Sequence, residues 1–87
     1  MPGDANYADT LGWILVQQGK IEAGLRQLRE ARLRNPGNAE IRYHLAFALA
    51  KIGRKAEARE ELQAALGLQA HLAASDEVKR LKQEIAN

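Results

Sequence analysis

The sequence predicts an all-α fold in which antiparallel helix pairs stack and a single helix closes the C-terminal end. An internal repeat is the first indication, because Leu11 and Gly19 return 34 positions later as Leu45 and Gly53. A period of that length indicates two copies of one supersecondary unit. Apolar residues also recur every three to four positions within each copy, which is the period of a helix and not of a strand.

The first unit is expected to be a helical hairpin. The Asp4 carboxylate can accept the unpaired backbone N–H groups at the start of a helix over residues 5–18. Gly19 ends that helix, because glycine adopts the left-handed conformation without a Cβ clash. A second helix over residues 21–34 ends before Pro36, since proline cannot continue a helix and displaces the residue before it from the α region.

The second unit repeats this pattern with a different ending. Asn38 is expected to cap a helix over residues 39–51, Gly53 repeats the stop, and a fourth helix covers residues 55–68. Residues 69–74 contain no proline and are expected to form a looser connection.

A fifth helix is predicted after the second unit. Ser75 can cap it, and Asp76 and Glu77 in its first turn suit the positive end of the helix dipole. An amphipathic helix after the last repeat is what a stacked array needs to cover its open end. The predicted apolar stripe consists of Val78, Leu81 and Ile85.

Small residues recur where the two helices of each pair are expected to cross. They are Gly12 and Gly24 in the first copy, and Ala46 and Ala58 in the second. Missing side-chain bulk at these points predicts two tightly packed hairpins.

Composition narrows the possible classes of function. Of the 87 residues, 46% are hydrophobic and 5% aromatic, which predicts one small domain with a thin core of Leu, Ile and Ala. The absence of cysteine excludes disulfides, thiolate zinc sites and cysteine nucleophiles. A net charge of +2, with both signs mixed along the helices, disfavours a nucleic-acid surface. No apolar run reaches the roughly 18 residues of a membrane span, and no signal segment is expected.

The spacing of these residues resembles the tetratricopeptide repeat family. The first copy reads Ala8-x2-Leu11-Gly12-x2-Leu15-x3-Gly19-x4-Gly24-x3-Leu28-x2-Ala31-x4-Pro36, and the second follows it from Leu45 to Ala65. The usual first-helix tryptophan is replaced by Ala8 and Arg42, and Gly24 replaces an alanine, which is expected to weaken packing slightly. The resemblance implies a right-handed superhelical stack with an extension at 1–4, repeats at 5–38 and 39–72, and a capping helix at 75–87.

A narrower resemblance concerns three motifs, which are similar to the final repeats of large bacterial tetratricopeptide proteins. They are Asp9-Thr10-Leu11-Gly12-Trp13, Glu40-Ile41-Arg42-Tyr43-His44-Leu45-Ala46 and Gly53-Arg54-Lys55-Ala56-Glu57-Ala58. Such proteins include lipoproteins associated with PEP-CTERM/exosortase and exopolysaccharide systems. This resemblance implies a C-terminal fragment of a bacterial envelope or periplasmic protein, with the cytoplasm as the alternative compartment.

The family resemblance also implies a function. The first helices of such repeats line a concave groove that binds a peptide or helix of a partner protein, usually within a larger scaffold. Aromatic residues are enriched among binding hot spots, and the groove collects the chain's single Trp, its single Phe and one of its two Tyr. Carried onto this chain, the groove residues are Asn6, Asp9, Trp13, Gln17, Glu40, Tyr43, Phe47 and Lys51, beside Val16 and Ala50.

An alternative is that Trp13 and Phe47 only pack between neighbouring helices. The groove interpretation is preferred because other residues are expected to fill the inward stripe. These are Leu11, Leu15, Leu45 and Leu49.

Other chemistries are disfavoured by the residues present. Chaperone-binding family members hold a C-terminal carboxylate with basic or amide groups, but those positions here are Asp9, Trp13 and Tyr43. His44 and His71 are expected to be isolated, so neither a metal site nor a cofactor is predicted. No Ser-His-Asp order or phosphate loop occurs, so the protein is predicted not to be an enzyme.

The arginine-rich second helix offers a third function. Its four arginines could contact an acidic partner or a nucleic acid, but Glu22 and Glu30 lie at i+4 spacing to two of them and favour surface ion pairs. The arginines are Arg26, Arg29, Arg32 and Arg34.

The N-terminal end of the stack is predicted to leave apolar area uncovered. Upstream repeats could cover it, a second copy could form a homodimer, or a different protein's helix could dock there. A structural or self-associating unit with an empty groove is therefore the alternative to peptide binding. The residues concerned are Tyr7, Ile14, Ile21 and Leu25.

Overall fold

The computed structural model describes residues 4–86, so residues 1–3 of the expected extension and residue 87 of the expected cap lie outside the described residues. Within 4–86 the chain forms five α-helices, one short 3₁₀-helix and no strand, which confirms the all-α prediction. The elements are α1 (Ala5–Gln17), α2 (Ile21–Arg34), α3 (Ala39–Lys51), α4 (Lys55–Leu68), η1 (Ala70–Ala74) and α5 (Asp76–Ile85).

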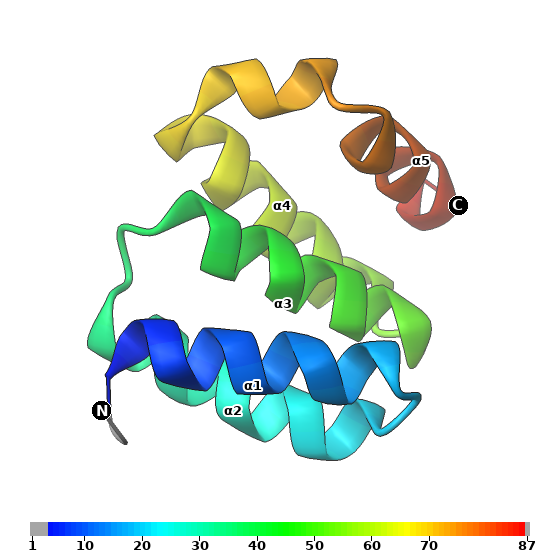
Figure 1. Cartoon of the computed structure of the whole chain (residues 1–87). Helices are drawn as coiled ribbons and strands as arrows, with labels where there is room; N and C mark the ends of the chain where they lie inside the picture. Colours follow the sequence, from blue (N-terminus) through cyan, green and yellow to red (C-terminus); the bar gives the residue numbers. More distant parts are fainter. Residues whose placement is uncertain (1–3, 87) are drawn as a thin grey trace.

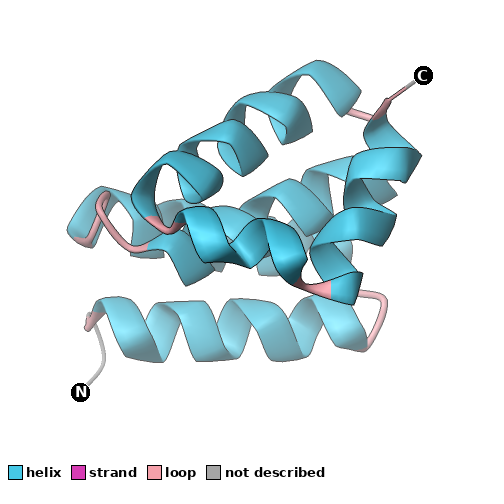
Figure 2. Cartoon of the chain, turned by 90° about the horizontal axis from the view of Figure 1, so that it is seen from above, coloured by secondary structure: helices cyan, strands magenta, loops and turns pink. Residues whose placement is uncertain are grey.

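The helices form two antiparallel hairpins that lie one on the other (Figure 1). α1 packs on α2 and α3 packs on α4, while α2 contacts α3 and so joins the hairpins. α5 crosses the end of the second hairpin and contacts both α3 and α4. Seen from above, short loops connect the helices (Figure 2). The molecule measures 35 × 25 × 20 Å.

Local signals set the helix boundaries. Gly19 and Gly53 have positive φ angles of 84° and 81°, which only glycine adopts readily, and each ends the first helix of a hairpin. Asp4 accepts the Asn6 N–H at 2.7 Å, and Asn38 accepts the Ile41 N–H at 3.0 Å. The predicted stops and these two N-caps are confirmed.

The two helices of the first hairpin approach each other closely where Gly12 meets Gly24. A Cβ added to Gly12 would lie 2.8 Å from Leu28 Cγ and 3.0 Å from the Gly24 carbonyl oxygen. A Cβ added to Gly24 would lie 2.6 Å from Val16 Cγ2. The expectation that Gly24 weakens the packing is therefore wrong, because α1 and α2 approach too closely at this point to admit an alanine.

One core cluster runs from α1 to α5. It includes Val16 of α1, Leu28 of α2 and Leu45 of α3, and the last two are fully buried. Leu11 and Leu15 are only partly buried, so the prediction that they fill the inward stripe of α1 is wrong. Smaller side chains than leucine face inward from α1 instead, and at Gly12 the close approach of α2 leaves no space even for a Cβ. The buried residues of α1 are Ala8, Asp9, Gly12 and Val16.

The C-terminal cap forms as predicted, but its connection is more ordered than expected. Ser75 Oγ accepts the Val78 N–H at 3.4 Å, and α5 begins at the next residue. Residues 70–74, expected to be loose, form η1. The apolar stripe of α5 is 2% exposed at each position, namely Val78, Leu81 and Ile85.

A buried carboxylate also joins the two hairpins. Glu61 of α4 accepts hydrogen bonds from Arg32 of α2 and, at 3.0 Å, from Arg42 of α3. Three helices therefore meet at one ion-paired centre. No helix among the described residues has the length and apolar character needed to cross a membrane.

Candidate functional site

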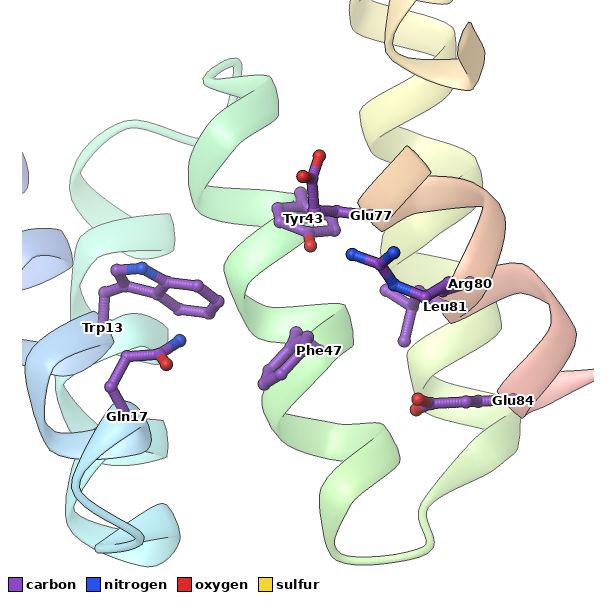
Figure 3. Close-up of a pocket in the computed structure, with 8 residues that line it drawn as sticks. All are labelled: Trp13, Gln17, Tyr43, Phe47, Glu77, Arg80, Leu81 and Glu84. Carbon is purple, nitrogen blue, oxygen red and sulfur yellow. The ribbon is translucent and has the colours of Figure 1, made fainter. Parts of the chain in front are cut away.

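A shallow groove lies between α1 and α5, with α3 as its floor. Two cavities of about 230 and 340 Å³ share Trp13, Tyr43 and Glu77, so they form one continuous surface that we call the aromatic groove. Trp13 and Gln17 project from α1, Tyr43 and Phe47 from α3, and Glu77, Arg80, Leu81 and Glu84 from α5 (Figure 3). The second cavity adds Glu40, His44, Gln69, Leu72, Ser75 and Val78.

The aromatic side chains in the groove contact one another. The Trp13 and Phe47 rings meet edge to face with centroids 5.1 Å apart, and Tyr43 lies 6.2 Å from Trp13. Lys51 Nζ lies 4.8 Å from the centre of the Phe47 ring, within the range of a cation–π contact. All three aromatic residues are partly buried, so they both pack against the core and present surface to the groove.

Trp13 also covers a buried histidine–carboxylate pair. His44 Nδ1 lies 2.7 Å from Asp9 Oδ1, which joins α3 to α1. The Trp13 indole stacks on the His44 ring with centroids 4.1 Å apart and planes 19° from parallel. Asp9 and His44 are only 6% and 9% exposed, so this polar pair is part of the packed interface between the repeats.

The α5 side of the groove carries charge. Burial raises the pKa of the Tyr43 phenol above its ordinary value, and the Glu77 carboxylate raises it further while Arg80 lowers it. The hydroxyl of Ser75 donates to Glu77 at 2.6 Å, and this hydrogen bond lowers the pKa of Glu77. At neutral pH the groove therefore presents an ionised Glu77 beside a Tyr43 hydroxyl that keeps its proton to donate.

The structure places five of the eight predicted groove residues along the two cavities: Trp13, Gln17, Glu40, Tyr43 and Phe47. Asn6 is exposed but lines neither cavity. Lys51 lies at the edge, over Phe47. Asp9 was predicted on the groove surface but is buried, because its carboxylate is paired with His44.

Sequence reasoning missed the α5 wall. Glu77 was expected only to complement the dipole of the capping helix, and Arg80 and Glu84 were assigned no role, yet all three form one side of the groove. The available signal was their spacing, since residues three and four apart share one face of a helix. That face becomes a groove wall because the adjacent Val78–Leu81–Ile85 stripe anchors α5 to the second hairpin.

The expectation that His44 is isolated is wrong. Its partner Asp9 lies 35 residues away, so a search for neighbours at i+4 along one helix misses it. Glu40, which does lie at i−4 on α3, completes a group of three side chains whose potential ligand atoms are within 4.8 Å of one another. His71, by contrast, lies exposed in η1.

The predicted self-association residues separate into two groups. Tyr7 and Ile14 are 50% and 48% exposed on α1, and we call them the N-terminal face. Ile21 is partly buried and packs against the main core. Leu25 is 3% exposed, so its assignment to an uncovered surface is wrong, because α2 turns it inward into the core cluster that the two hairpins share.

Three of the four arginines on α2 are paired with carboxylates. Arg29 lies 3.6 Å from Glu57, and Arg34 lies 2.9 Å from Glu30 as its i+4 spacing predicts. Arg32 binds the buried Glu61. These pairs neutralise most of the strip and favour the interpretation of paired surface charges over a nucleic-acid site.

Stacked helical hairpins with a groove along the first helices define a helical-repeat protein. The tetratricopeptide repeat family model matches residues 10–76, and the chain belongs to that family. Repeats of this kind generally mediate protein–protein interactions and are typically non-catalytic. No curated protein matches the chain, and no solved structure matches it. The narrower resemblance to bacterial envelope lipoproteins stays a prediction.

Proposed function

We propose that the chain is a non-catalytic interaction module that binds a peptide segment of a partner protein in the aromatic groove. One observation carries this proposal: Trp13, Tyr43 and Phe47 lie together, partly exposed, along two adjoining cavities. Rigid aromatic side chains supply large contact area with few torsions to immobilise, and they dominate many interfaces. The shallow, open shape suits an extended or helical peptide rather than an enclosed small molecule.

The charges around the groove specify the peptide further. Among the residues that line the two cavities, Glu40, Glu77 and Glu84 are carboxylates and Arg80 is the arginine. A peptide with an apolar anchor flanked by Lys or Arg would place its anchor on the aromatic floor and its cations near this rim. The same rim repels a terminal carboxylate, in agreement with the absence of a carboxylate-binding pattern in the sequence.

Selection from a phage-displayed library of random peptides tests this proposal. The selected peptides are expected to carry basic residues beside an apolar one and to shift the amide NMR signals of the groove residues. Phe47→Ala should weaken the binding of these peptides about fivefold or more, because a central anchor typically contributes over about 1 kcal/mol. We choose to substitute Phe47 and not Trp13, because Trp13 stacks on His44. Loss of Trp13 would therefore weaken the packing of the repeats as well as peptide binding.

A charge variant provides the matched comparison. Glu84→Gln should weaken binding and reduce its salt dependence, whereas Glu60→Gln, exposed on α4 outside the groove, should change neither. Peptides that bind equally well to wild type and to Phe47→Ala would overturn the proposal.

A second candidate function, self-association, is favoured by the internal register. Tyr7 and Ile14 of the first repeat stand where Ile41 and Ala48 stand in the second. Ile41 and Ala48 are 1% and 0% exposed, and Ile41 packs against Ala8 of the first repeat. The two residues of the N-terminal face therefore occupy positions that, in the second repeat, are buried against a neighbouring helix. A second copy of this chain can cover it through a two-fold contact.

Light scattering over a hundredfold range of concentration tests the second candidate. A dimer that Ile14→Glu converts to a monomer would support it. Leu33→Glu is the control, because Leu33 is also apolar and exposed but lies near the end of α2. A wild-type monomer at every concentration would exclude self-association through this face.

A further inference from the structure

A mixed carboxylate–imidazole group lies at the junction of the two repeats. Glu40 and His44 are one helical turn apart, so they share a face of α3. Asp9 reaches the same point from α1. One potential ligand atom from each residue lies within 4.8 Å of the other two. Three oxygen and nitrogen donors are therefore gathered in one small region at the junction of the two repeats.

We infer that Asp9, Glu40 and His44 bind a divalent first-row transition-metal ion of the zinc type. Imidazole with carboxylate is a ligand set that such ions accept, whereas calcium and magnesium prefer oxygen ligands in larger number. Three protein ligands leave at least one coordination position for water or for a partner's side chain, as in open zinc sites.

The surroundings hold the ligands in place. Asp9 and His44 are almost completely buried, and their side chains already lie in contact, with His44 Nδ1 2.7 Å from Asp9 Oδ1. Stacking of Trp13 on the His44 ring restricts it further.

The site has an entry path. Glu40 and His44 both line the cavity of about 340 Å³, so an ion can reach them from the groove. Its open coordination position would face the same cavity. The ion would then become part of the groove surface, although its binding does not depend on whether the groove binds a peptide.

Titration of the full chain, free of any affinity tag, with Co²⁺ and then competing Zn²⁺ tests the inference. We expect a saturable visible Co²⁺ absorption that Zn²⁺ removes, and quenching of the fluorescence of Trp13, the chain's single tryptophan. Glu40→Gln should weaken binding about tenfold or more. Glu40 is exposed, so this change should leave the fold intact, which circular dichroism checks.

Two controls separate this site from other metal binding. Glu77→Gln removes a carboxylate from the same cavity but outside the cluster, and His71→Ala removes the other histidine. Neither should change the affinity. Loss of binding in His71→Ala, unchanged binding in Glu40→Gln, or no saturable binding at millimolar Co²⁺ would overturn the inference and leave Asp9–His44 as a structural hydrogen bond only.

Discussion

At the scale of single residues, the contact between Gly12 and Gly24 sets how closely α1 and α2 pack. Gly24→Ala would place a methyl group 2.6 Å from Val16 Cγ2 and 2.8 Å from the Gly12 carbonyl oxygen. The two helices must move apart to accommodate this methyl group, because the Gly12 carbonyl oxygen belongs to the backbone and cannot move aside as a side chain can. We expect the free energy of unfolding to fall by about 1–3 kcal/mol, as for other overpacked cores. Urea denaturation followed by circular dichroism measures it.

Gly67 provides the matched control for that substitution. It lies in α4, and apart from the adjacent backbone of its own helix nothing lies within 4 Å of the position its Cβ would take. Gly67→Ala should therefore stabilise the protein by about 0.5–1 kcal/mol, because alanine has the higher helix propensity. Equal changes in the free energy of unfolding for Gly24→Ala and Gly67→Ala would show that helix propensity, and not the close approach of α1 and α2, determines the effect at Gly24.

The sequence predicts single residues well only where the cause is local. Gly19 and Gly53 were recognisable as helix stops because a positive φ is a property of one residue. Asp9 and His44 were not recognisable as a pair, since they lie 35 positions apart and meet only when the repeats stack. The aromatic side chains of the groove could be predicted, because Trp13 and Phe47 occupy equivalent positions in the two repeats and therefore lie on the same face of the stack.

At the scale of helices, Glu61 fastens α4 to α2 and α3. Its carboxylate is 11% exposed and binds both Arg32 and Arg42. Glu61→Gln leaves two arginines without a counter-charge at a largely buried position. Removing one partner of a buried ion pair typically costs about 3–5 kcal/mol, and solvent access to the arginines places the expected loss at the lower end.

Glu60→Gln tests whether that loss belongs to the buried site. Glu60 is the exposed neighbour on α4, so its substitution should change the free energy of unfolding by less than about 0.5 kcal/mol. Thermal denaturation of Glu61→Gln and Glu60→Gln under the same conditions measures this difference in stability. Similar melting temperatures for both would show that the Glu61 cluster contributes little.

Helix boundaries and the groove wall differ in how far the sequence predicts them. The boundaries of α2, α3 and α4 agree with the expected ranges because caps, glycines and Pro36 act within one turn. The α5 wall depends instead on how α5 packs on α3 and α4 after η1, an arrangement of separate segments that has no local sequence signal.

At the scale of the whole molecule, one core cluster draws residues from all five α-helices. The repeat period predicted the stacking itself, because each hairpin alone leaves its apolar face uncovered. A continuous core also implies that the two repeats and α5 unfold together. Leu45 of α3 is a fully buried member of this cluster.

Leu45→Ala tests that cooperativity. The substitution should cost about 2–5 kcal/mol, a large part of the roughly 5–15 kcal/mol that holds a typical domain folded. Leu33→Ala, at a position 74% exposed, should cost almost nothing. In a cooperative molecule, Trp13 fluorescence, which reports on the first repeat, and far-ultraviolet circular dichroism, which reports on all helices, shift by the same amount. Two separated transitions would instead mean that the hairpins unfold independently and that the shared core is too thin to couple them.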